Sequence, residues 1–96
     1  MSAVSRTVAI TNRRGLHARA SAKFVTLASQ QPCEVRVEKD GARDAGGEAV
    51  TGTSIMGLMM LGAAMGDSIR ISAKGDDAEA AVEAMCALVE GKFGED

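Results

Sequence analysis

The chain has 96 residues, of which 46% are hydrophobic and 25% are charged, with a formal net charge of −2, so it suits a single small domain spanning residues 1–96. Only two residues are aromatic, which disfavours nucleic-acid modules that stack bases on aromatic side chains. No stretch approaches the roughly 20 apolar residues of a membrane span, so membrane insertion is not expected.

The first 40 residues predict strand, helix and strand. Residues 5–11 alternate between larger apolar and polar side chains, as a half-buried strand does. Ala18 to about Ser29 has helical spacing, and Pro32 ends that helix or begins the return loop. Residues 33–39 alternate again. The expected buried side of the helix comprises Ser21, Phe24, Val25 and Ala28, with Leu27 beside it.

Asp40-Gly41 is a hairpin signal, and the Gly-rich sequence after it predicts a long hairpin tip over about 40–50. The chain is expected to return in a short strand around 49–51. Ser54 then stands at the N-cap of a short apolar helix that runs to about Gly62.

Residues 67–73 alternate and predict another strand. We expect Asp76 to cap a final helix, with Glu79 completing a capping box and Gly91 ending it. The apolar positions of this helix follow the i, i+3, i+4, i+7 rule. They are Ala78, Ala81, Val82, Met85, Leu88 and Val89.

The predicted order is therefore β-α-β-β-α-β-α, an α+β chain. Helices on one face of an antiparallel sheet would bury the one-sided strands and helices. Cys33 and Cys86 lack metal-ligand spacing, and the N-terminal residues lack the apolar core of a signal peptide. We therefore expect two packed thiols in a cytoplasmic protein.

Charge is distributed unevenly along the chain. Five of the eleven basic residues precede Glu34, the first acidic residue, so the remaining six share the rest of the chain with all thirteen acidic residues. The early basic residues surround the single histidine, His17. A local cationic patch of this kind suits an anionic group or an acidic partner surface. The five residues are Arg6, Arg13, Arg14, Arg19 and Lys23.

His17 lies where a strand gives way to a helix, a position that usually holds Asp, Ser, Thr or Asn. A neutral imidazole there is a competent nucleophile near neutral pH. A phosphoryl group on the ring would lie over the helix N-terminal amides of Ala18 and Arg19, within reach of the Arg19 guanidinium. On the residues alone, a phosphohistidine carrier, an anion-binding module and a partly buried structural histidine remain alternatives. A metal site is disfavoured because neither a second histidine nor a nearby Cys, Asp or Glu is present.

The short helix after Ser54 is apolar almost all round. Leu58 and Leu61 are expected to pack in the core. The remaining apolar side chains would form an adaptable contact surface for partners, because methionine adjusts its shape to different neighbours. Phosphate on Ser54 would add roughly two negative charges at the start of this helix.

Two stretches resemble the HPr family, the histidine-containing phosphocarriers of the phosphoenolpyruvate-dependent phosphotransferase system. They are Gly15-Leu16-His17-Ala18-Arg19 and Ser54-Ile55-Met56-Gly57-Leu58-Met59. The resemblance implies an open-faced β-sandwich with a four-stranded antiparallel sheet and three helices. It also implies a stoichiometric carrier rather than an enzyme with its own turnover, and no cofactor is expected. A monomer is the default expectation, because transient docking at one exposed face requires nothing more.

The resemblance implies roles for particular residues. His17 would accept phosphate on Nδ1 from enzyme I and pass it to an enzyme IIA domain, and Arg19 would steady the phosphoryl group. Ser54 matches the regulatory serine that a dedicated serine kinase/phosphorylase modifies in many bacteria. The partner-docking face would comprise Ile55, Met56 and Met59.

Two positions depart from the family pattern. Ala20 stands where proline is usual and Thr53 where lysine is usual. The alternative function is a regulatory interaction protein of the same fold, acting through Ser54, Met56 and Met59. A sugar-uptake role and a nitrogen- or metabolism-linked relay both remain open for the carrier.

Overall fold

The computed structural model describes residues 3–40 and 49–95, so most of the predicted hairpin tip at 40–50 lies outside the described residues. The helices and strands follow the predicted order. They are β1 (Ala3–Ala9), α1 (Ala18–Ser29), β2 (Val35–Lys39), β3 (Val50–Thr51), α2 (Ile55–Met60), β4 (Ser68–Lys74) and α3 (Ala78–Glu90), followed by a single 3-10 turn, η2 (Lys92–Gly94).

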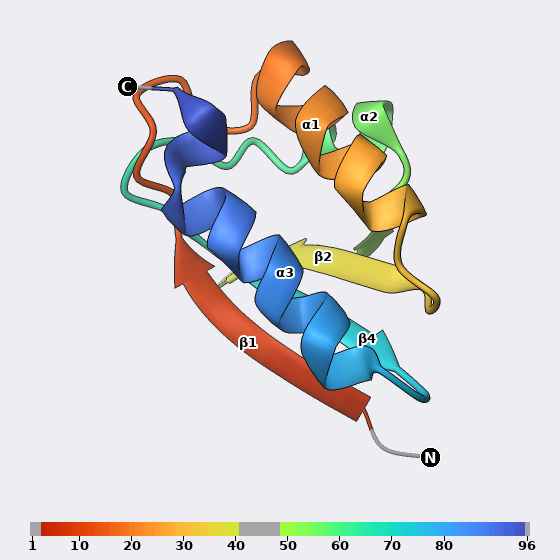
Figure 1. Ribbon diagram of the computed structural model, residues 1–96. Coiled ribbons are helices and arrows are strands. Elements are labelled where there is room, and N and C mark those ends of the chain that lie inside the picture. Colours follow the sequence, from red (N-terminus) through yellow and green to blue (C-terminus); the bar gives the residue numbers. More distant parts are fainter. Residues whose placement is uncertain (1–2, 41–48, 96) are drawn as a thin grey trace.

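The four strands form one sheet in the order β1-β4-β2-β3, with every neighbouring pair antiparallel. The centre of the sheet is β4, where Ile69 pairs with Val8 of β1 and Ile71 pairs with Val37 of β2. The three helices lie on one face of this sheet (Figure 1). The predicted α+β open-faced sandwich is therefore confirmed.

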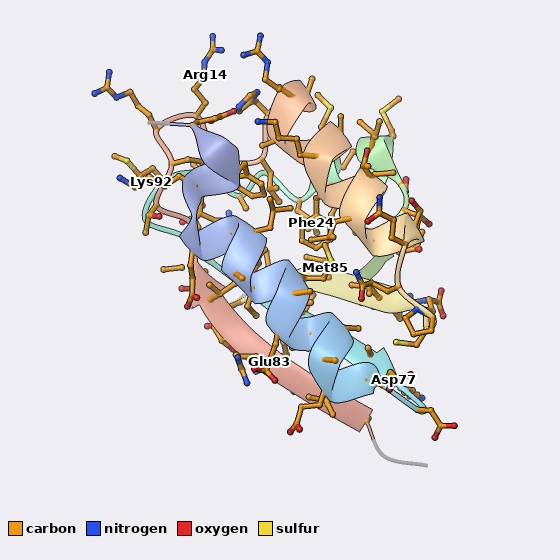
Figure 2. The ribbon with its side chains drawn as sticks, in the orientation of Figure 1. Arg14, Phe24, Asp77, Glu83, Met85 and Lys92 are labelled. Carbon is orange, nitrogen blue, oxygen red and sulfur yellow. The ribbon has the colours of Figure 1, made fainter. Side chains whose placement is uncertain are left out.

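The core lies between the helices and the sheet. Phe24 of α1 and Met85 of α3 point into the space between these helices and the strands (Figure 2), and both are fully buried. They meet Ile69 and Ile71 from the central strand. Burial of one such side chain contributes roughly 1.5–3 kcal/mol, so this core orients α1 on the sheet.

The start of α3 differs from the prediction. Asp77, rather than Asp76, is the N-cap, and it makes no side-chain capping hydrogen bond. Asp77 has φ 65°, and Ala78 N–H donates to the Gly75 carbonyl across a tight turn at 3.2 Å. Asp tolerates the left-handed region better than most residues, so the turn after β4 sets this helix start instead of a capping box.

The segment between α2 and β4 holds the β1–α1 loop in place. Ile10 N–H donates to the Asp67 carbonyl at 2.8 Å, and Leu16 N–H donates to the Ala63 carbonyl at 3.0 Å. Gly15 adopts φ +63°, and a Cβ there would come within 2.5 Å of the Ala63 carbonyl oxygen. Only glycine allows this close backbone approach. Among the described residues, no helix is long and apolar enough to cross a membrane.

Candidate functional site

His17 is the N-cap of α1, as predicted. Its backbone is extended, with φ −74° and ψ −179°, and its ring Nδ1 accepts a hydrogen bond from the Arg19 N–H at 3.2 Å. The first turn of α1 contains no acidic residue. The histidine ring therefore takes the place of the carboxylate or hydroxyl that usually caps a helix.

The other ring nitrogen of His17 faces a carboxylate. The distance between His17 Nε2 and Glu95 Oε2 is 2.7 Å. Because Nδ1 already accepts from a backbone amide, the hydrogen-bond network assigns the ring proton to Nε2, which donates to Glu95. Nδ1 is left with its lone pair toward the start of α1.

Glu95 is the residue that the sequence prediction missed, and its presence overturns the expectation that no acidic residue lies near His17. It comes from the segment after α3, 78 positions along the chain from the histidine. Figure 1 shows this segment beside the loop that leads from β1 into α1. Buried Phe93 anchors the segment, and Lys23 Nζ donates to the Phe93 carbonyl at 2.7 Å. No local sequence pattern signals such a contact.

Asn12 connects the β1–α1 loop to Glu95. Its side chain is fully buried, and its Nδ2 donates to the Gly15 carbonyl at 2.9 Å and to Glu95 Oε1 at 3.1 Å. Its Oδ1 has no hydrogen-bond partner in the described part of the chain. Glu95 thus accepts from Asn12 on one oxygen and from His17 on the other, which orients the carboxylate on both sides.

The surroundings keep Glu95 ionised. Burial raises the pKa of its carboxyl group, but the hydrogen bonds from Asn12 and His17 and the positive charge of Lys23 together lower it by more. The net pKa of Glu95 is therefore below its ordinary value, so a negative charge faces Nε2 at neutral pH.

Three arginines surround this carboxylate. Arg13, Arg14 and Arg19 line a hollow together with Glu95, and all three are exposed. Arg14 points outward at the end of the molecule opposite Asp77 (Figure 2). Within residues 3–40 and 49–95, no acidic side chain forms an ion pair with any of these arginines. The site can therefore hold an anion with two or more charges.

The α1 start forms without the expected proline. Ala20 is fully buried, and α1 nevertheless begins at Ala18. The Ser21 N–H closes the first turn on the His17 carbonyl at 2.8 Å. The amides of Ala18 and Arg19 remain at the helix start, where a phosphoryl group on Nδ1 would lie.

Ser54 is the N-cap of α2, as predicted, and its Oγ accepts from the Gly57 N–H at 3.0 Å. Behind it, Leu58 is buried and Leu61 half-buried, which confirms their expected core packing. The side chains expected to dock partners are exposed: Ile55 by 42%, Met56 by 70% and Met59 by 43%. Met60 of α2 and Met65 of the segment after it are exposed as well.

The described residues contain no cluster of three or more His, Cys, Asp or Glu side chains that could hold a metal ion. Both cysteines are free thiols. Burial raises the pKa of the Cys86 thiol, partly offset by the charge of Arg6.

Comparisons with known proteins show which family this chain resembles. Residues 4–91 match the family model described as the PTS HPr component phosphorylation site. The phosphocarrier protein NPr of Shewanella violacea is 41% identical over 95 residues, covering 99% of this chain and 98% of the relative. The phosphocarrier protein HPr of Neisseria meningitidis is 46% identical over 92 residues, covering 96% and 97%.

Solved structures show the same likeness. The crystal structure of HPr from Thermoanaerobacter tengcongensis superposes with a TM-score of 0.82 at 44% identity, covering 100% of this chain and 99% of the other. That of HPr from Bacillus anthracis gives 0.80 at 37% identity, covering 93% and 99%. The chain therefore belongs to the HPr family of phosphocarrier proteins of the phosphotransferase system.

Proposed function

We propose that this chain accepts a phosphoryl group on Nδ1 of His17 from enzyme I and passes it to enzyme IIA domains. The observation that carries the proposal is the orientation of the ring. Nε2 is engaged by Glu95, so the lone pair of Nδ1 is directed to the start of α1. A nucleophile in this orientation meets a phosphoryl donor with the helix amides already in place.

Arg19 supplies the next contribution. It follows His17 by two residues, lines the cationic hollow and is exposed, so its guanidinium can hold two phosphoryl oxygens at once. The backbone amides of Ala18 and Arg19 add uncharged hydrogen-bond donors that the helix holds in place. These groups bind the phosphoryl oxygens and leave the N–P bond free for transfer, as a carrier requires.

The apolar surface of α2 is the proposed docking face for both partners. α2 packs against α1, so Ile55, Met56 and Met59 lie on the element next to the one that carries His17 at its start. Exposed methionines can fit more than one partner surface. One such face serves a protein that meets its donor and its acceptors in turn, and we propose that it does so as a cytoplasmic monomer.

Phosphorylation of Ser54 is the proposed regulatory step, carried out by a serine kinase/phosphorylase. Ser54 stands at the edge of the docking face, directly before Ile55 and Met56. A phosphate there adds roughly two negative charges to an apolar surface, which opposes the approach of an acidic partner. Ser54→Asp is expected to slow phosphorylation of His17, and phosphorylation at the wild-type rate would contradict this role.

The deciding experiment uses the whole chain with enzyme I, magnesium and labelled phosphoenolpyruvate. The wild-type chain is expected to take up acid-labile, base-stable label, and His17→Ala is expected to take up none. Ser54→Ala serves as the control that distinguishes histidine from serine phosphorylation. Absence of label on the wild-type chain would show that it is not a carrier.

The enzyme IIA domains that accept phosphate from this chain would then distinguish a sugar-uptake role from a regulatory relay. Similarity to both HPr and NPr proteins is compatible with sugar uptake and with a regulatory relay. Transfer from the labelled chain to sugar-type and nitrogen-type enzyme IIA domains would assign the branch. A second candidate, a regulatory interaction protein, is favoured by the exposed α2 face; in that case partner binding would survive in His17→Ala.

A further inference from the structure

Phosphoryl transfer at a histidine creates a charge that the protein must accommodate. When neutral imidazole accepts a phosphoryl group on one nitrogen and keeps the proton on the other, the ring becomes a cation. At His17 this cation would form among Arg13, Arg14 and Arg19, which oppose a further positive charge. A negative group beside the protonated nitrogen would offset that repulsion.

Glu95 is placed to do this. Its Oε2 lies 2.7 Å from Nε2, on the ring nitrogen that does not take the phosphoryl group. We infer that Glu95 is a positioning residue for the transfer, holding the proton on Nε2 of His17 through both the accepting and the donating step. This inference rests on the proposed carrier function.

The two steps balance without any proton transfer. In the accepting step, the Nδ1 lone pair forms the N–P bond, while the bond from phosphorus to the donor breaks and its electron pair leaves with the donor. The ring keeps Nε2–H and becomes a phosphoimidazolium beside the Glu95 carboxylate. In the donating step, a nucleophile of the acceptor protein forms a bond to phosphorus while the N–P bond breaks and its electron pair returns to Nδ1. Neutral imidazole, which is a good leaving group, is restored.

The position of Glu95 is determined by several contacts. Asn12 holds its other oxygen, and Asn12 is itself fixed by burial and by the Gly15 carbonyl. Phe93 is buried in the core, and Lys23 holds its carbonyl from α1. Both oxygens of the Glu95 carboxylate are therefore hydrogen-bonded, and the chain is anchored two residues earlier by buried Phe93. These contacts fix the carboxylate in its position beside His17.

The charged groups that face the ring come from three elements. Arg13 and Arg14 lie in the loop before α1, Arg19 and Lys23 belong to α1, and Glu95 follows η2. The neighbouring helix α2 has no charged residue. Glu95 is therefore the single negative side chain among the described groups around His17.

The test compares Glu95→Gln with Glu83→Gln, a control that removes the same charge from an exposed position on α3, far from Arg14 (Figure 2). An amide has one oxygen, so it cannot accept from His17 on one oxygen and from Asn12 on the other, as the carboxylate does. In the unphosphorylated protein, nitrogen-15 NMR is expected to show faster exchange of the His17 Nε2 proton with water in Glu95→Gln than in the wild type. Glu83→Gln is expected to match the wild type.

The second readout is the pH profile of phosphoryl loss from the phosphorylated chain. Glu95→Gln is expected to move the alkaline limb to lower pH, lowering the rate at pH 8.5 by about three- to tenfold. An unchanged profile in a variant that still takes label on His17 would overturn the inference and leave the carrier function standing. A wild-type chain that takes no label would overturn both.

Discussion

Two helices in this molecule begin with the same kind of side-chain N-cap, but the two capping residues have different surroundings. α1 and α2 each begin after a residue whose side chain accepts a backbone N–H, His17 at 3.2 Å and Ser54 at 3.0 Å. Neither helix has an acidic residue in its first turn. Beyond the cap they differ, because His17 also binds Glu95 whereas Ser54 is bonded within its own turn.

The surroundings of the two capping side chains differ. The Ser54 hydroxyl completes a local hydrogen bond next to an exposed apolar surface. The His17 ring is held from outside the helix by a carboxylate and lies among arginines that form no ion pair within the described residues. Under the proposed function, the capping atom Nδ1 would exchange its amide for a phosphoryl group. The tertiary surroundings, rather than the cap itself, distinguish the two.

The largest expected effect comes from breaking the loop that leads to α1. Gly15→Ala places a Cβ within 2.5 Å of the Ala63 carbonyl oxygen at positive φ, and we expect it to lower the free energy of unfolding by about 2–4 kcal/mol. Gly62→Ala is the control, since Gly62 has φ +67° but nothing within 4 Å of an added Cβ. Its cost should be about 1 kcal/mol in the same urea titration. Equal losses in the two variants would show that the contact with Ala63 is unimportant.

Removing a cation from the α1 start tests the chemistry there. Arg19→Ala keeps the backbone N–H that donates to His17 Nδ1 but removes the guanidinium. The rate of phosphoryl acceptance should therefore fall about tenfold. Arg6→Ala, on exposed β1, is the matched control and should keep the wild-type rate. The measurement is initial label uptake from enzyme I. A similar decrease in both variants would indicate general charge attraction.

Removing the cap from the α2 start should affect stability alone. Ser54→Ala leaves the Gly57 N–H without its acceptor, which should cost about 1 kcal/mol of unfolding free energy. Because Ser54 touches none of the groups around His17, label uptake should remain at the wild-type rate. A large decrease in uptake would mean that the two helix starts are coupled.

The smallest effect concerns the stability that the Glu95 contact provides. The pKa of Glu95 is lower in the folded chain than its usual value of 4.5, so its contribution to stability is present above that value. It is lost as the pH falls through the lowered folded value. The difference in unfolding free energy between wild type and Glu95→Gln should therefore persist at pH 7 and disappear in acid. A difference independent of pH would contradict the charged contact.

Much of the fold followed from residue patterns within one turn or one strand. The bounds of α1, the short helix after Ser54 and the alternating strand around Ile71 all match their predicted positions to within one or two residues. The prediction failed at Asp76, because the preceding turn puts Asp77 in the left-handed region and takes over the helix start. At this position, the geometry of the turn between β4 and α3 determines the helix start, rather than the capping preference of Asp76.

The residues of the candidate site also fall into two groups, those that local sequence predicted and those that only tertiary contacts brought together. The sequence by itself determined that His17 caps a helix amid arginines and that Ser54 caps a second one, because a cap depends on residues within about four positions. Only the tertiary structure brought Glu95 to Nε2 and buried Asn12 against the other carboxylate oxygen. The contact between His17 and Glu95 spans 78 positions, and Glu95 follows Phe93, which is buried in the core. Burial energy of this kind belongs to the assembled core, so no local pattern of residues could reveal it.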